Sequence, residues 1–561
     1  MAAEAGAIVT AGLRPDLFER RGVLLASRTL VIAVLSALVL AAFGLRVSGL
    51  SAEGLSEDEL NKLNAVADYR QNGLTAANGE HPMLMKALQT ATVVIAEKWN
   101  RTSLAGGSGS ALQVAPETAL RLPSTIFGAL TVLLIYLLAC ELFGAEVALI
   151  AAALWAFDPQ AIGFNRIAKE DTFLLFFFVL ANIFWLRGQR VAEGRPDRKP
   201  EPYYWATAAC LGAMMASKYL PQMIAVGICY YWMFQAIPET RWRLGKKRFL
   251  IFLFIMGGVF LLLSPTTLLP ATWREMGLFA GQKRIGHDGY EFMGTLYSHR
   301  MTDWLAGIPW YFYFAFLAVK LPLLTFAGFV VGLPMLFRRK LGDGRYFVLF
   351  WMFVWAMTFV FPGGKFTRYL TVVLPAVMIT AAVGLQFVGR WAGRQLVALV
   401  SVRQVGAYAR TALALSLVVG SLWASVSAAP HFRLYTNSLG GGMANAGYYF
   451  PHDEFYDASL REVMAEIASR AKPGATVATE TPGLAAYYAE RANRPDLICI
   501  SLSDPESVKQ LGEGDYVVNA RGRRYFSNDA LLFGLKKTGA PAFHSSLDGI
   551  QSVDVYLVET G

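Results

Sequence analysis

Two neighbouring carboxylates, Asp58 and Glu59, lie just beyond the first long apolar segment of the chain and could work as an acid–base pair. A hydroxyl group that attacks a sugar carbon must give up its proton to a base. One carboxylate could take that proton while its neighbour orients the base or the acceptor. Acidic side chains are also favoured in the first turn of a helix, so a capping role stays open beside the catalytic one.

Four ionisable side chains occur within seven residues between two later apolar segments, in the sequence NRIAKED at residues 165–171. Charges at a membrane edge are costly unless they line a watery cavity. We therefore expect Arg166 and Glu170 to bind substrate and Asp171 to act with Asp58. These two aspartates are also the candidate ligands for a divalent metal ion, if one is used; neither a firm metal site nor another cofactor is predicted. The alternative is a solvated turn in which Asp171 caps the next helix.

A donor that carries phosphate needs fixed cations, and five lysine or arginine residues lie at the same ends of the apolar segments as these acids. A single lysine there more often runs along apolar surface to reach water, but five beside carboxylates favour a phosphate-binding site. Arg368 is the first candidate because its planar guanidinium matches two phosphate oxygens. Glu80 and His81 are further substrate-binding candidates, although such a histidine could also cap a helix or pack. The five cations are Lys86, Lys218, Lys320, Lys365 and Arg368.

Long apolar segments must position these groups. The 561 residues are 55% hydrophobic and 16% charged, whereas soluble chains are about 45–50% apolar and about 25% charged. Segments near the length of a bilayer recur along the chain, which predicts a polytopic α-helical membrane protein with about eleven spans. The expected spans are 29–47, 119–140, 145–163, 172–188, 203–217, 219–236, 249–265, 316–337, 345–362, 369–389 and 411–428.

The basic loops predict how these spans are oriented. Arginine and lysine gather before residue 28 and in loops at 187–199, 241–248, 338–345 and 390–410. With eleven spans all of them fall on one side, which is the cytoplasm by the positive-inside bias. The net charge of +10 is thereby explained without a nucleic-acid partner. The candidate site residues and the C-terminal segment then face outward across the cytoplasmic membrane.

Two regions outside the spans carry their own patterns. The first outer loop, 48–118, has apolar residues at helical spacing around residues 60–67 and 84–95, which predicts two amphipathic helices at the membrane surface. The segment from residue 431 alternates strand-like and helical stretches. We therefore divide the chain into a membrane domain, 1–430, and a small α/β domain, 431–561. The expected strands are 475–479, 497–502, 516–519 and 553–559, and the expected helices are 459–470, 483–491, 505–511 and 529–538.

Taken in order, these motifs resemble those of the protein O-mannosyltransferase family, glycosyltransferase family 39. The resemblance covers roughly residues 20–390 and includes the bacterial, phospholipid-carrier-dependent members and the related aminoarabinose lipid A transferases. One motif departs from the family, because its HPPLGK reads HPMLMK here. The shared motifs are Asp58-Glu59, HPMLMK at 81–86, RLPS at 121–124, NR with DTFLLFF at 165–177, Ser217-Lys218 and GGKFTRY at 363–369.

The resemblance implies a GT-C membrane fold and a polyprenyl-phosphate sugar as donor. A sugar, a hexose such as mannose, would pass with inversion to a hydroxyl of a protein, lipid or glycan, with Asp58 as the base. Two other classes of protein fit parts of the pattern. A transporter or flippase for lipid-linked sugars would use the membrane-edge charges as a pathway, and an assembly protein would work through its C-terminal segment alone.

Overall fold

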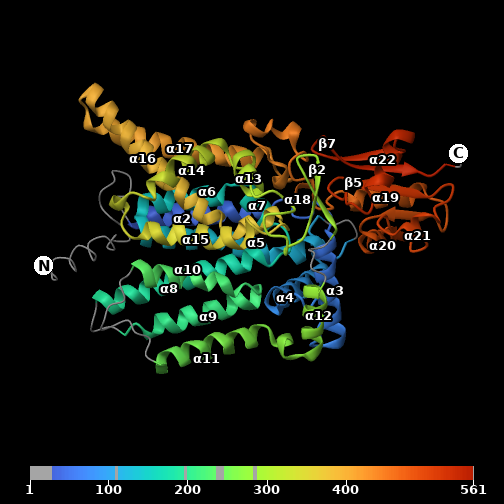
Figure 1. The fold of residues 1–561 in the computed structure, drawn as a ribbon, viewed down its shortest axis with the longest axis horizontal. Coiled ribbons are helices and arrows are strands. Elements are labelled where there is room, and N and C mark those ends of the chain that lie inside the picture. The colour runs from blue at the N-terminus through green and yellow to red at the C-terminus, as the bar shows by residue number, and fades with distance from the viewer. Residues whose placement is uncertain (1–27, 108–110, 195–198, 235–245, 282–286, 560–561) are drawn as a thin grey trace.

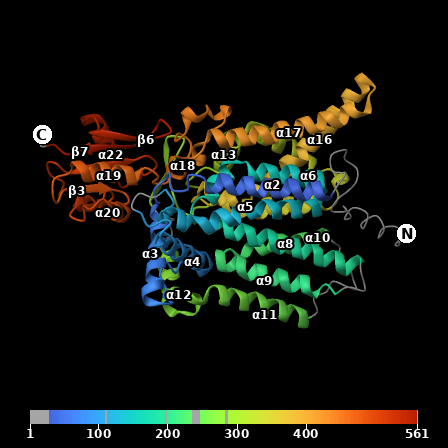
Figure 2. The same cartoon turned by 180° about the vertical axis from the view of Figure 1, so that it is seen from behind.

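The computed structural model describes residues 28–107, 111–194, 199–234, 246–281 and 287–559. The basic residues expected before residue 28, at 195–198 and at 241–243 lie outside this part of the chain. The described residues form a long bundle of helices that carries a layer of strands and short helices at one end (Figure 1). Seen from behind, the same end also carries two helices that lie across the tips of the bundle, α3 and α4 (Figure 2).

The bundle contains the helices expected from the apolar segments. Within the described residues, five helices are long and apolar enough to cross a membrane, or six if a bent pair counts as one span. The protein is thus a multi-pass membrane protein, and the number eleven stays a prediction. The bundle helices are α2 (Arg28–Val47), α5 (Pro116–Phe143), α6 (Ala145–Ala156), α7 (Pro159–Asn165), α8 (Asp171–Gly194), α9 (Glu201–Ser217), α10 (Ile224–Phe234), α11 (Lys246–Leu263), α13 (Phe312–Lys320), α14 (Leu323–Met335), α15 (Gly344–Phe359), α16 (Leu374–Val400) and α17 (Arg403–Ser427).

Two expected spans are divided at a proline in the structure, and others have different ends. The segment 145–163 is the bent pair α6 and α7, which meet at 61°, because Asp158 caps α7 and Pro159 starts it. The segment 316–337 is divided into α13 and α14 by Leu321 and Pro322. The segment 369–389 is wrong at both ends, since α16 begins at Leu374 and continues to Val400. Proline suits a first helical turn and disfavours the continuation of a helix that precedes it.

Glycine lets two central helices of the bundle touch. Helix α14 contains the pair Gly328 and Gly332, one turn apart, and both face α16. A Cβ atom on Gly332 would lie 1.9 Å from the carbonyl oxygen of Thr380, and one on Gly384 would lie 2.1 Å from that of Gly328. Small residues at four-residue spacing allow this close packing in membrane helices. The contact fixes α16, whose N-terminal end leads directly into the candidate site.

The first outer loop forms the two predicted amphipathic helices, α3 (Glu57–Asn72) and α4 (Met83–Asn100). Ser56 and Glu59 make a reciprocal capping box at the start of α3, which satisfies backbone N–H groups that have no partner within the helix. A third outer helix, α12 (Pro270–Gly281), and a hairpin of β1 (Gly289–Phe292) and β2 (Thr295–Ser298) complete this end of the bundle. The hairpin was not predicted.

The C-terminal segment forms a five-stranded sheet in the order β4-β3-β5-β7-β6. Strand β3 (Thr476–Thr479) runs parallel to β4 (Ile498–Ser501) and β5 (Tyr516–Ala520). Strand β7 (Ile550–Leu557) runs antiparallel to β5 and to β6 (Phe543–Leu547), which the sequence pattern did not predict. The helices that accompany the strands are α18 (Pro451–Phe455), α19 (Leu460–Arg470), α20 (Pro482–Arg491), α21 (Pro505–Val508) and α22 (Asp529–Thr538).

The sheet shares its core with the membrane-edge helices. One apolar cluster joins Val477 of β3 and Leu484 of α20 to Leu60 of α3, Val93 of α4 and Leu120 of α5. A second, smaller cluster packs α22 on the opposite face of the sheet. Apolar contact across this boundary therefore fixes the C-terminal segment above the tips of the bundle helices.

Candidate active site

A cavity of about 720 Å³ lies between the tips of the bundle helices and the C-terminal segment. Nine parts of the chain surround it, including α12 with the apolar residues Met276 and Ala280, so no single element builds the site. Its charged and polar lining comes from α3, the loops before α4 and α8, the turn after α9, the hairpin region, the turn before α16 and two stretches of the C-terminal segment. The lining side chains used below are Glu57, Asp58, Glu80, His81, Lys169, Glu170, Asp171, Lys218, His287, Tyr290, Phe366, Arg368, Tyr369, His452, Tyr456, Arg523 and Tyr525.

Asp58 occupies the first turn of α3 and faces this cavity, with 38% of its side chain exposed. Its Oδ2 atom accepts a hydrogen bond of 2.8 Å from the Tyr456 hydroxyl. The same oxygen pairs with the Lys169 ammonium and lies 3.8 Å from the Arg368 guanidinium. Groups from three other parts of the chain thus converge on one carboxylate.

The charge of Asp58 follows from these neighbours. Burial raises the pKa of the carboxyl, but the cations of Lys169, Arg368 and Lys62 together hold the pKa well below its ordinary value. Burial also raises the pKa of Tyr456 well above its usual range, so the phenol stays protonated and continues to donate. Asp58 is therefore an ionised acceptor throughout the neutral pH range.

Asp171 begins α8 on the opposite wall. Its Oδ1 atom accepts a hydrogen bond of 2.6 Å from the Lys218 ammonium, which also lies 4.9 Å from the centre of the Tyr369 ring. The other oxygen, Oδ2, is buried without a hydrogen-bond partner among the described residues. A buried carboxylate oxygen without a partner is costly, so this atom is available to a donor on a bound molecule.

Arg368 lies close to Asp58, in a short 3-10 helix just before α16. Its guanidinium carbon stacks 3.9 Å from the centre of the Phe366 ring. One terminal nitrogen faces Asp58, and the other lies 3.7 Å from Asp453 of α18. That second nitrogen is buried and has no hydrogen-bond partner in the described part of the chain. A rigid, stacked guanidinium with an unused donor suits a bound phosphate group.

A third cluster of ionisable side chains surrounds Glu170. Its Oε1 atom lies 3.0 Å from the Lys62 ammonium and 3.5 Å from Nδ1 of His81. Burial lowers the pKa of His81 well below its usual range, against the opposing attraction of Glu170, so the imidazole is neutral near pH 7. Glu80 lines the same side of the cavity and accepts a hydrogen bond from the Asn78 amide.

Glu59 is not brought to the cavity, although it is the direct neighbour of Asp58. Its side chain is fully buried. Arg121 of α5 binds it through two hydrogen bonds of 2.8 and 2.6 Å, and the backbone N–H of Ala168 donates to it at 2.9 Å. Glu59 therefore joins α3, α5 and the loop before α8, which positions Asp58 and Lys169.

Four other sequence candidates are also buried away from the cavity, where each holds the fold. Lys86 donates to the carbonyls of Ala77, Asn78 and His81, at 2.7 to 3.0 Å. Arg166 donates to the carbonyls of Arg46, Ser48 and Gly49. Lys320 pairs with Glu454. Lys365 donates to the carbonyls of Ile308 and Pro362.

Lys169, Tyr456 and Arg523 line the cavity but were not among the sequence candidates. Lys169, which pairs with Asp58, lies inside the NRIAKED cluster and could have been selected from it. Tyr456 and Arg523 come from the C-terminal segment, where no motif marks them. Arg523 binds Asp457 with its Nε atom at 2.7 Å and lies 3.3 Å from Glu57. His287 stacks on Tyr525 at 4.0 Å, which joins the loop after α12 to the same wall.

The described residues contain no group of three or more histidine, cysteine, aspartate or glutamate side chains arranged to hold a metal ion. Asp58 and Asp171 each pair with a lysine instead. A divalent ion at these two aspartates stays a prediction from the sequence.

Comparison with known proteins supports the resemblance seen in the motifs. A family model, described as dolichyl-phosphate-mannose-protein mannosyltransferase, matches residues 108–268. This segment includes Lys169, Asp171 and Lys218 of the cavity. The match confirms the similarity to the O-mannosyltransferase family over that part of the chain. A search of curated proteins finds no match.

Solved structures show the fold. ArnT from Cupriavidus metallidurans in the apo state is 14% identical, with a TM-score of 0.50 over 93% of this chain and 97% of its own. The oligosaccharyltransferase from Archaeoglobus fulgidus in the apo form is also 14% identical, with a TM-score of 0.51 over 88% of this chain and 70% of its own. The archaeal oligosaccharyltransferase AglB from the same organism, in complex with an inhibitory peptide and a dolichol-phosphate, is 13% identical, with a TM-score of 0.50 over 87% and 69%. The chain therefore has the GT-C fold of these membrane glycosyltransferases.

Proposed function

We propose that the protein transfers a sugar from a polyprenyl-phosphate carrier to the hydroxyl group of an acceptor, at the end of its helix bundle that carries the cavity. One observation carries this proposal. A single cavity brings together an ionised carboxylate, Asp58, and an arginine with a buried unused donor, Arg368. A base for a hydroxyl and a cation for a phosphate are the two groups that this reaction requires.

Asp58 is the general base of the proposed reaction. The acceptor oxygen forms a bond to the anomeric carbon of the sugar, and the bond from that carbon to the phosphate oxygen breaks. The acceptor proton passes to a carboxylate oxygen of Asp58, and the Tyr456 hydroxyl keeps that carboxylate oriented. Attack from the face opposite the leaving phosphate gives a product with inverted configuration.

Arg368 and Lys218 receive the leaving group. Charge grows on the carrier phosphate as the glycosidic bond breaks, so fixed cations stabilise the transition state more than the ground state. Arg368 is held by stacking on Phe366 and needs little reorganisation to bind two phosphate oxygens. The free Oδ2 atom of Asp171 accepts a hydrogen bond from a sugar hydroxyl or from the acceptor.

The comparisons support the GT-C fold and a polyprenyl-phosphate carrier, but they do not identify the sugar. The AglB structure contains a dolichol-phosphate, and the matching family model describes enzymes that use a dolichyl-phosphate sugar. We propose a hexose such as mannose as the sugar, an acceptor of protein, lipid or glycan, and an active face outside the cytoplasmic membrane. The one-sided basic loops of the sequence favour that orientation.

Two measurements test the proposal. Purified protein, given a polyprenyl-phosphate hexose and a membrane extract that contains both proteins and lipids as acceptor source, should release free polyprenyl phosphate and join the hexose to a component of the extract. Mass spectrometry of proteins and lipids from cells with the gene, without it, and with Asp58→Asn identifies the acceptor. A donor that stays intact while it crosses vesicle membranes would indicate a transporter and contradict the proposal. Unchanged proteins and lipids in all three strains would contradict it as well.

A further inference from the structure

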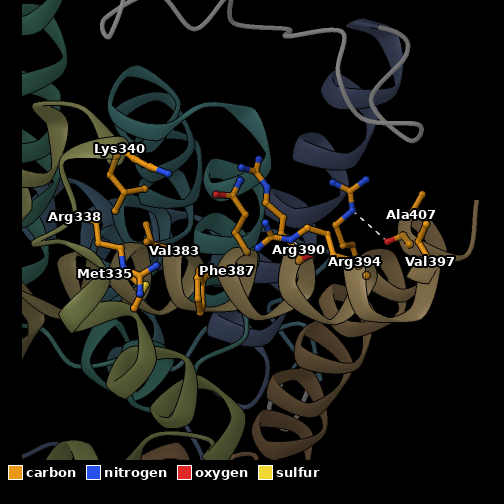
Figure 3. Close-up of a pocket in the computed structure, with 14 residues that line it drawn as sticks. Met335, Arg338, Lys340, Val383, Phe387, Arg390, Arg394, Val397 and Ala407 are labelled. Atoms are coloured by element: carbon orange, nitrogen blue, oxygen red, sulfur yellow. Dashed lines mark hydrogen bonds between the residues drawn. The ribbon is translucent and has the colours of Figure 1, made fainter. Parts of the chain in front are cut away.

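A second cavity, of about 700 Å³, lies at the opposite end of the bundle from the candidate active site. It opens between the end of α14, the turn after it, and the helices α16 and α17. Figure 3 shows the basic side chains of Arg338, Lys340, Arg390 and Arg394 around it. The remaining residues of the lining are Met335, Leu341, Val383, Gln386, Phe387, Gly393, Val397, Gly406, Ala407 and Arg410.

Five cations surround this cavity, and no carboxylate occurs among the described residues that line it. Of these five cations, only Arg390 has an acidic partner among the described residues. That partner is Glu146 of α6, at 2.9 Å. Arg394 and Arg410 instead donate to backbone carbonyls of their own helices. Cations that share a small space repel one another, so a bound anion would stabilise the whole group.

The floor of the cavity is apolar, and two glycines explain why the cations meet there. A Cβ atom on Gly393 of α16 would lie 2.8 Å from the carbonyl oxygen of Gly406 in α17. The two helices therefore touch at this point, which brings Arg394 and Arg410 to one cavity. Met335, Val383 and Phe387 line its inner side, where the glycerol part of a lipid would meet carbon rather than water.

The level of the cavity matches a membrane surface. Trp391 of α16 and Tyr408 of α17 directly follow lining residues in the sequence, and the two residues are 53% and 69% exposed. Exposed tryptophan and tyrosine are typical of the headgroup region of a bilayer. Both helices have the length and composition of membrane spans, and the apolar stretch of α17 is only 17% buried inside the protein, so lipid can reach the cavity directly from the side.

We propose that this basic cavity binds the phosphate headgroup of an anionic phospholipid, with the guanidinium groups of Arg394 and Arg410 on the phosphate and the apolar floor against the glycerol. Basic pockets between membrane helices are suited to such headgroups. Orientation of the chain in the membrane does not explain the arrangement by itself, because Lys246 and Lys247 at the start of α11 supply exposed charge at the same end but do not line this cavity.

Binding of phosphatidylglycerol to the full chain in a neutral detergent tests this site. Phosphatidylcholine serves as the uncharged-headgroup comparison, and inorganic phosphate serves as the soluble anion. Removing both cations in Arg394→Gln/Arg410→Gln should weaken phosphatidylglycerol binding about 30-fold, because each cation near a membrane surface contributes roughly a factor of five. The matched control, Lys246→Gln/Lys247→Gln, removes the same charge outside the cavity and should change the dissociation constant less than threefold.

The outcomes separate the possible ligands. An equal loss in the control pair would mean general attraction to a charged surface and would overturn the site. Unchanged binding in the arginine pair would overturn it too, as would inorganic phosphate that displaces the lipid at low millimolar concentration. If Arg394→Gln/Arg410→Gln unfolds at a lower temperature without lipid, its weaker binding does not test the site. Two other variants, Arg394→Lys/Arg410→Lys and Lys340→Gln, then provide the test. The first should keep most of the affinity, and the second should lose about fivefold.

Discussion

At the scale of single residues, the chemistry of Asp58 depends on groups that surround one carboxylate oxygen. Asp58→Asn keeps the shape of the side chain but removes the proton acceptor. We expect kcat to fall by about 10²–10⁴-fold, the usual size of general-base catalysis, with little change in expression. Asp68→Asn is the control, because Asp68 lies on the same helix outside the cavity lining. Wild-type turnover by the purified Asp58→Asn enzyme would remove the assignment.

The cations around Asp58 also set the pH dependence of the reaction. Because they hold its pKa well below the ordinary value, the carboxylate loses its charge only when the pH falls through that lowered pKa. The rate should therefore show no acidic decline from Asp58 between about pH 5 and 8. Lys169→Gln removes the strongest of the cations and should move the acidic decline of kcat/KM toward neutral pH. A profile that does not move would show that Lys169 does not control this charge.

Arg368 gives the clearest test of phosphate binding. Arg368→Ala should lower kcat and raise KM for the donor, because the leaving phosphate loses a forked, charge-assisted contact. Arg368→Lys should recover only part, since an ammonium cannot match two oxygens in one plane. Steady-state kinetics with a defined polyprenyl-phosphate sugar measure both effects. If the lysine variant equals the wild type and the alanine variant only expresses poorly, Arg368 merely anchors the turn before α16.

Residue types and spacing predicted part of this site. Asp58, Asp171, Lys218 and Arg368 all line the cavity, whereas Glu59 does not. A lysine that faces a cavity and one that binds backbone carbonyls look alike in a sequence, because only distant segments decide the difference. For Lys86, Arg166 and Lys365 those segments are loops whose carbonyls need donors, and for Lys320 the distant partner is Glu454 of α18. Tyr456 could not be found at all, since nothing local to it points toward α3.

At the scale of elements, the Glu59–Arg121 pair connects an outer helix to a membrane helix. Glu59→Gln leaves a buried guanidinium without its charge partner, which typically costs about 3–5 kcal/mol. We expect a clear drop in the unfolding midpoint in detergent, together with a smaller loss of kcat than in Asp58→Asn. The control is Glu97→Gln, which breaks the exposed pair of Arg70 and Glu97 between α3 and α4. Exposed pairs contribute about 0–1 kcal/mol, so equal destabilisation by both variants would contradict the structural role of Glu59.

The presence of a helix or strand was easier to predict than the residues at which it begins and ends. Apolar length and period identified the bundle helices and two of the three outer helices, α3 and α4, because burial in lipid or against a core imposes those patterns. The breaks at Pro159 and Pro322 depend on how neighbouring helices accept the bend, which the sequence does not show. The hairpin of β1 and β2 was missed because its strands have four residues each and no strong alternation.

At the scale of the whole molecule, the two cavities lie at opposite ends of the bundle, and the sequence assigns one end to each side of the membrane. Reporter fusions after Lys247 and Arg339 should read cytoplasmic, because their loops are basic. Fusions after Gly79 and Asp515 should read outside. Inside readings at Gly79 and Asp515 with outside readings at the basic loops would reverse the orientation and place the proposed reaction in the cytoplasm.

The division of the chain into two domains at residue 431 stays a prediction. The shared apolar cluster shows that the two parts pack against each other. The sheet packs on α3, α4 and α5, and its segment supplies Tyr456 and Arg523 to the cavity. Sequence pattern could identify the strands but not this attachment, since it depends on two surfaces that are distant in the chain. The C-terminal segment is thus part of the site rather than an appendage to it.

The hydrogen bond between Tyr456 and Asp58 joins residues 398 positions apart. The two residues are therefore synthesised at different times. A ribosome that adds about 5–20 residues per second needs about 20–80 seconds to make that stretch. Throughout that interval Asp58 is already at the membrane edge while its orienting hydroxyl does not yet exist. Each new molecule therefore completes its bundle first and becomes competent only after its last quarter has been made and packed onto α3.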